Sequence, residues 1–101
     1  MAAHRVEGFD APAEGDLTTV EVDGAEVGVT VIDGQVYAFD DECTHAACSL
    51  ADGELEGGAV VCPCHFAKFD LTTGAVLDGP AMTPLGIWRA RLVDGALELE
   101  R

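Results

Sequence analysis

Basic residues are scarce in this chain. Its 101 residues include only five Lys and Arg against 19 Asp and Glu, which gives a formal net charge of -14. A surface with this much negative charge repels phosphate backbones and anionic lipids and attracts basic proteins. We therefore expect no nucleic acid ligand, and we expect any protein partner to present basic side chains.

Long apolar runs and helical periodicity are also missing. No apolar run approaches the roughly 20 residues that a membrane-spanning helix needs, and Met1 to Asp10 lacks the basic start and hydrophobic stretch of a signal peptide. Glycine occurs 12 times, too often for long helices, and no segment repeats apolar residues with a period of 3.6. We predict a cytoplasmic, all-β protein that does not enter the membrane.

Five segments rich in β-branched, aromatic or aliphatic residues are predicted strands. Three Asp-Gly pairs, which are strong signals for tight hairpins, divide the first three segments from one another and the last two from each other. The pairs are Asp23-Gly24, Asp33-Gly34 and Asp94-Gly95. We expect a meander near the N-terminus, a hairpin near the C-terminus, and an antiparallel sandwich or barrel overall. The predicted strands are Val20–Val22, Val27–Ile32, Val36–Phe39, Ile87–Val93 and Ala96–Leu99.

The middle of the chain has a different composition. The stretch from about residue 41 to residue 84 contains all four cysteines, two of the three histidines and several glycine-containing turns. A chain of this length without internal repeats indicates one domain. We therefore predict a single domain over residues 1–101, with a loop-rich, ligand-binding subdomain at about 41–84 inserted between the strand-rich segments.

Two short motifs within this stretch, Cys43-Thr44-His45 and Cys62-Pro63-Cys64-His65, offer thiolates and imidazoles together. Cysteines clustered in an intracellular protein favour metal or redox chemistry over a disulfide framework. A structural zinc site also uses Cys and His, but zinc knuckles separate paired ligands by two to four residues, whereas one residue separates Cys43 from His45. Buried free cysteines fit poorly among these glycine- and proline-containing turns.

The two motifs resemble those of the Rieske iron-sulfur proteins. The segments Leu50–Gly57, Phe69-Asp70, Thr73-Gly74, Gly79–Ala81 and Pro84-Leu85 are similar to loop landmarks of small Rieske ferredoxins. The resemblance implies a Rieske-like β fold and one [2Fe-2S] cluster. It also implies that Cys43 and Cys62 bind one iron while His45 and His65 bind the other.

Cys48 and Cys64 are left over by this ligand set. In the Rieske proteins of respiratory and photosynthetic complexes, cysteines at the matching positions form a disulfide that ties the two ligand loops together. Many small Rieske ferredoxins lack the pair, and cytosolic disulfides are uncommon. The resemblance therefore implies a bridge between Cys48 and Cys64, with two free thiols as the alternative.

Four further residues are expected around the cluster by the same resemblance. High-potential Rieske proteins carry Ser and Tyr, which hydrogen-bond to sulfur, where this chain has Ala67 and Phe69. Losing such bonds lowers the potential, so we expect a value near the lower end of the Rieske range, about -150 mV. Gly79 and Pro80 resemble the start of the loop that covers the cluster in this family.

Small soluble Rieske ferredoxins pass electrons from a flavoprotein reductase to a terminal ring-hydroxylating oxygenase, often in the breakdown of aromatic compounds. The sequence has no nucleophile–base motif, phosphate-binding loop or nucleotide fingerprint. We therefore predict a monomeric electron carrier that is not itself an enzyme. The alternatives are a Rieske-type small subunit of a nitrite reductase and a structural zinc-binding module.

Overall fold

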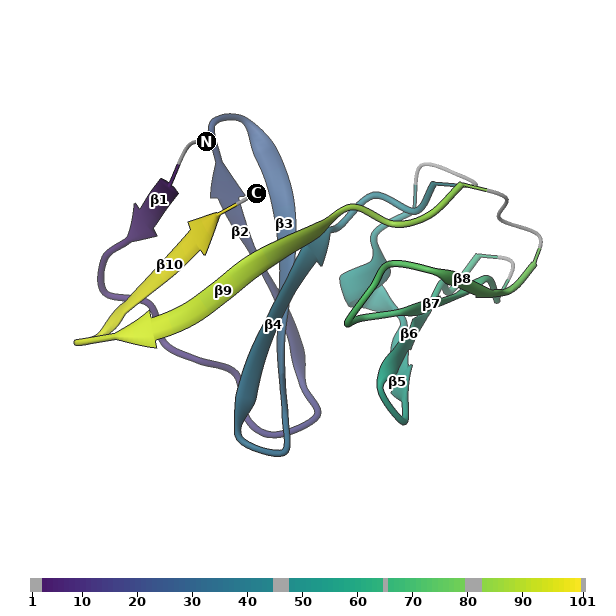
Figure 1. The fold of residues 1–101 in the computed structure, drawn as a ribbon, viewed down its shortest axis with the longest axis horizontal. Helices are drawn as coiled ribbons and strands as arrows, with labels where there is room; N and C mark the ends of the chain where they lie inside the picture. Colours follow the sequence, from purple (N-terminus) through teal and green to yellow (C-terminus); the bar gives the residue numbers. More distant parts are fainter. Residues whose placement is uncertain (1–2, 45–47, 65, 80–82, 101) are drawn as a thin grey trace.

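Two antiparallel β-sheets make up the protein in its computed structural model (Figure 1). The structure describes residues 3–44, 48–64, 66–79 and 83–100. Within these ranges no helix is long and apolar enough to cross a bilayer. The larger sheet curls on itself, and the smaller sheet lies at one end of it, beyond the end of β4 and the start of β9. The predicted all-β class is confirmed.

The larger sheet combines strands from both ends of the chain. Its strand order is β1-β10-β9-β4-β3-β2, so the C-terminal hairpin pairs with the N-terminal meander through β9 and β4. The strands are β1 (Ala3–Val6), β2 (Leu17–Val22), β3 (Ala25–Ile32), β4 (Gln35–Asp40), β9 (Ile87–Val93) and β10 (Ala96–Glu100).

Asp-Gly pairs form the three predicted hairpin turns. Both residues of each pair have positive φ, for example 51° at Asp23 and 82° at Gly24. Such turns match the right-handed twist of the flanking strands. The predicted hairpins are confirmed. Strand β9 has its predicted bounds, and the other four predicted strands extend one to three residues beyond theirs. The short strand β1 was not predicted, because Ala3–Val6 lacks a hairpin signal.

The smaller sheet lies in the stretch that we expected to be mostly loops. Its strands pair in the order β5-β6-β7-β8. Each strand has three residues, which is too short for alternation between polar and apolar residues to identify it in the sequence. The strands are β5 (Glu54–Glu56), β6 (Ala59–Val61), β7 (Lys68–Asp70) and β8 (Val76–Asp78), and a 3₁₀ turn at Leu50–Asp52 precedes them.

Strand β4 contributes to two separate cores, because successive side chains of a strand point to opposite faces of the sheet. Ala38 packs with Trp88 and the aliphatic residues inside the larger sheet. Phe39 faces the other way and packs with Val60 and Phe69 of the smaller sheet. Gly28 lies opposite Phe39, where a Cβ atom would be 2.3 Å from the ring. This close approach lets the Phe39 ring join the two sheets.

Asp41 connects the end of β4 to the loop that follows. Its side chain is 5% exposed, and its carboxylate accepts hydrogen bonds from the Ser49 hydroxyl at 2.5 Å and the Ala51 amide at 2.9 Å. The backbone amide of Leu50 donates to the Asp41 carbonyl at 2.8 Å. These bonds close the loop over residues 42–49 at its base.

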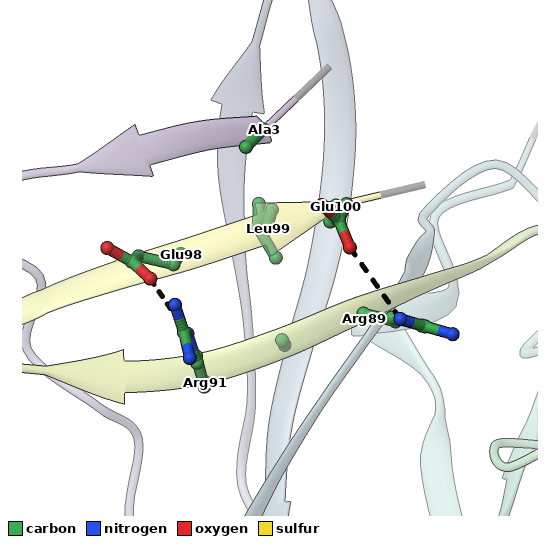
Figure 2. Close-up of a pocket in the computed structure, with 7 residues that line it drawn as sticks. Ala3, Arg89, Arg91, Glu98, Leu99 and Glu100 are labelled. Carbon is green, nitrogen blue, oxygen red and sulfur yellow. Dashed lines mark hydrogen bonds and ion pairs between the residues drawn. The ribbon is translucent and has the colours of Figure 1, made fainter. Parts of the chain in front are cut away.

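Arginine side chains cross-link the outer face of the larger sheet. Figure 2 shows Glu98 directed at Arg91 and Glu100 directed at Arg89 across β9 and β10. Arg5 on β1 also donates to Glu98, at 2.7 Å. The hydrogen bond from Arg91 holds the pKa of the Glu98 carboxyl below its usual value. Three of the described basic residues therefore lie together on this sheet.

Replacing Asp41 by Ala should destabilise the protein, since it leaves the Ser49 hydroxyl and the Ala51 amide without their partner. Both donors are half-buried, so we expect a cost of about 1 kcal/mol, the lower end of the range for a buried donor that loses its acceptor. Urea unfolding followed by Trp88 fluorescence measures the effect. The matched control is Asp10→Ala, which removes an exposed carboxylate. Equal unfolding midpoints for the two variants would show that Asp41 does not hold the loop.

Candidate metal centre

The first ligand loop begins directly after Asp41. Cys43 is 3% exposed, and its sulfur is not part of a disulfide. Its backbone amide donates to the carbonyl of Cys48 at 3.0 Å, and a bridge pairs Glu42 with Ser49. The loop is therefore closed at its neck by backbone pairing. His45 lies outside the described residues.

The second ligand loop joins β6 to β7 and is built in a similar way. Cys62 is fully buried, with a free thiol, and its amide donates to the carbonyl of Ala67 at 2.8 Å. In both loops a cysteine amide thus bonds to the carbonyl five residues further along the chain. The Phe66 amide adds a bond to the Cys62 carbonyl at 3.0 Å. His65 lies outside the described residues.

A disulfide between Cys48 and Cys64 ties the two loops together. The Cα atoms of this pair are 6.5 Å apart, and the sulfur of Cys62 lies within 4.8 Å of both bonded sulfurs. The sequence left open a disulfide or two free thiols at Cys48 and Cys64, and the structure has the disulfide. Because Cys48 and Cys64 are bonded to each other, the thiols left to bind metal are those of Cys43 and Cys62.

A third segment is attached to the first loop. The Thr44 hydroxyl donates to the Thr83 carbonyl at 2.7 Å, and the Leu85 amide donates to the Gly74 carbonyl at 2.8 Å. Gly74 has a φ of 81°, and a Cβ atom there would lie 2.1 Å from the Leu85 carbonyl oxygen. Only glycine allows this contact. Gly79, expected as part of the cluster cover, is exposed at the start of this segment.

The expected neighbours of the cluster are partly described. Ala67 and Phe69 are fully buried, and neither side chain carries a hydroxyl that could bond to sulfur. Pro80 lies outside the described residues. The roles of Asp41, Thr44 and Gly74 as supports of the loops were not predicted from the sequence. Thr44 stands inside the first motif, which was a usable signal. The roles of Asp41 and Gly74 depend on partners eight to eleven residues away, which no local sequence pattern indicates.

The donors that the structure describes fit an iron-sulfur cluster. Cys43 and Cys62 belong to one buried group of side chains with Leu50, Phe69 and Leu85. Iron-sulfur clusters are held by cysteine thiolates, and an apolar, water-poor surrounding helps to set their potential. An iron-sulfur cluster held in this way would accept and release one electron at a time.

Comparisons with known proteins agree with this chemistry. The family model of the Rieske [2Fe-2S] domain matches residues 4–89. The ferredoxin component of the naphthalene 1,2-dioxygenase/salicylate 5-hydroxylase systems of Ralstonia sp. is 43% identical over 71% of this chain and 69% of its own length. The naphthalene 1,2-dioxygenase ferredoxin component of Pseudomonas aeruginosa is also 43% identical, over 66% of this chain and 64% of its own length.

Solved structures show the same likeness. The ferredoxin of carbazole 1,9a-dioxygenase from Nocardioides aromaticivorans matches with a TM-score of 0.88 and 28% identity, over 99% of this chain and 98% of its own. A chain from the complex of reduced oxygenase and oxidized ferredoxin in carbazole 1,9a-dioxygenase matches with a TM-score of 0.84 and 30% identity, over 95% and 99% of the two chains. The chain therefore belongs to the Rieske [2Fe-2S] family, as a ferredoxin that carries electrons on its cluster.

Proposed function

We propose that this protein takes one electron from a flavoprotein ferredoxin reductase and passes it to the terminal oxygenase of a ring-hydroxylating system. The observation that carries this proposal is its 43% identity to ferredoxin components of naphthalene dioxygenase systems. Its likeness to a chain from a solved oxygenase–ferredoxin complex supports the oxygenase as the acceptor. In this role the protein would be a monomeric electron carrier in the cytoplasm, and it would serve an oxygenase that breaks down aromatic compounds.

The proposed ligands are Cys43 and Cys62 for one iron and His45 and His65 for the other. Both cysteines are buried and neither is part of a disulfide, which supports the cysteine half of this set. The Cys-x-His and Cys-x-x-His spacings support the histidine half. The bound cluster supplies a one-electron redox couple. The protein keeps water from the thiolates and holds the two loops together through the disulfide.

Neither rival function is favoured by a specific observation. Small-subunit proteins assigned to nitrite reductases share the fold at 22% and 23% identity, which supports a common fold alone. A zinc module is contradicted by the match to the Rieske [2Fe-2S] family.

Reconstitution tests the proposed function. The protein is mixed with the reductase and terminal oxygenase of a naphthalene dioxygenase system, NADH and naphthalene, and dihydrodiol formation is measured. We expect product formation that depends on the protein and saturates with its concentration. If the protein is reduced by the reductase but supports no turnover in this or other ring-hydroxylating systems, the proposed acceptor is wrong.

Two matched cysteine variants test the ligand assignment. Cys62→Ser should abolish the red-brown absorbance and iron content of the purified protein, because a serine hydroxyl is a poor ligand for iron. Cys64→Ser removes only the bridge and should retain the cluster with a shorter half-life. Iron and sulfide analysis with visible and electron paramagnetic resonance spectra distinguishes the two. The opposite pattern would overturn the assignment.

The absence of hydroxyls at Ala67 and Phe69 predicts a midpoint potential near the lower end of the Rieske range, about -150 mV. The double variant Ala67→Ser with Phe69→Tyr should raise the potential. A hydrogen bond that favours the reduced state by about 1 kcal/mol shifts a one-electron couple by ~40 mV. A spectroscopic redox titration measures both proteins. A wild-type midpoint above about +100 mV would contradict the prediction, given the Rieske range.

A further inference from the structure

Phe66 is the most exposed large apolar residue that the structure describes. Its side chain is 71% exposed, and its φ is 63°, a backbone conformation that residues other than glycine seldom adopt. The ring therefore adds little to the core, although it stands four residues after Cys62. An exposed aromatic ring of this kind is available for contact with another molecule.

A hollow of about 270 Å³ lies beside this ring. Its lining includes Phe66, Pro63 and the proposed ligand Cys62, together with the acidic residues Asp52 and Glu54. Both acidic residues are exposed, and neither forms an ion pair within the described part of the chain. We call this hollow the acid–aromatic notch.

Gly53 is what brings the two acidic residues to the notch. A Cβ atom at Gly53 would lie 2.0 Å from the Val61 carbonyl oxygen and 3.2 Å from the Pro63 side chain. The chain can therefore pass this close to the second ligand loop only with glycine at this position. Glu54 consequently pairs with Val61 across β5 and β6, one residue before Cys62.

Charge is unevenly distributed around the notch. Arg5, Arg89 and Arg91 lie on the larger sheet, and the one described lysine, Lys68, is paired with Glu56 at 2.5 Å. The notch thus combines an aromatic face with two carboxylates that have no ion-pair partner among the described residues. The whole protein, with a net charge of -14, also attracts cations. A cation placed against an aromatic ring and a carboxylate gains from both.

We propose that the acid–aromatic notch binds an arginine or lysine side chain of the terminal oxygenase. The cationic head of that side chain lies at Asp52 and Glu54, and its stem lies along the Phe66 ring. This deepens the proposed function and rests on it, because a carrier needs a docking point beside its redox centre. Seated there, the partner's side chain lies against the loop that carries Cys62.

Oxidation of the reduced protein by tris(phenanthroline)cobalt(III), a cation with aromatic faces, tests the notch. One electron leaves the protein, and Co(III) becomes Co(II). We expect the second-order rate constant to fall about three-fold in Phe66→Gly, as expected for one exposed cation–π contact. Glycine suits the positive φ, so this variant should fold normally. Phe66→Tyr keeps the ring and should keep the rate.

The acidic residues are tested with the double variant Asp52→Asn with Glu54→Gln. Its matched control, Asp10→Asn with Glu21→Gln, removes two exposed carboxylates away from the notch. We expect the notch variant to slow the cobalt reaction more than the control, and neither to slow oxidation by the anion ferricyanide. Unchanged visible spectra confirm that the cluster is intact. Equal slowing by the two double variants, or full activity of Phe66→Gly, would overturn the proposal.

The partner assay separates this proposal from the proposed function. The same variants are compared as electron donors to the naphthalene dioxygenase oxygenase at low and high ionic strength. If the notch variants lose rate with both cobalt and oxygenase, both proposals are supported. If wild-type protein reduces cobalt with the expected dependence on the notch but reduces no oxygenase, the acceptor is wrong and the cation site stands.

Discussion

Two thiols from loops distant in sequence must be held together, buried and unoxidised, and the rest of this structure depends on that constraint. Cys43 and Cys62 follow strands of different sheets, so local structure alone cannot bring them together. The Cys48–Cys64 disulfide joins the loops directly. Asp41 closes the base of the first loop, and Thr44 attaches that loop to the segment around Thr83. Each thiol therefore lies on a loop that is held by the disulfide or by these hydrogen bonds.

The position of the two ligand loops depends in turn on the packing of the smaller sheet against strand β4. The alternating faces of β4 place Ala38 in one core and Phe39 in the other, so the smaller sheet packs on a strand that is already held on both sides. The charges follow the same division: arginines gather on the larger sheet, whereas the described surface beside Cys62 carries acidic residues and Phe66. The docking surface proposed beside Cys62 would favour brief, electrostatically steered encounters.

Sequence reasoning succeeded where the signal is local. Asp23-Gly24 and Asp94-Gly95 require little more than their own backbone preferences to form tight turns, and their hairpins are present as predicted. The strands β5 to β8 escaped prediction because three residues are too few to show a period. Strand β1 exists because β10 offers it an edge, which no feature of Ala3–Val6 indicates.

The sequence by itself determined the family and the chemistry, because cysteine and histidine at these spacings have few uses other than a [2Fe-2S] site. It also determined which side chains lack hydroxyls near that site, since Ala67 and Phe69 can be read directly. Tertiary structure alone decided that Cys48 and Cys64 are bonded, that Asp41 supports the first loop, and that Gly53 brings Asp52 and Glu54 beside Phe66. These contacts join residues at least eight positions apart in the chain, and no local sequence pattern specifies such pairings.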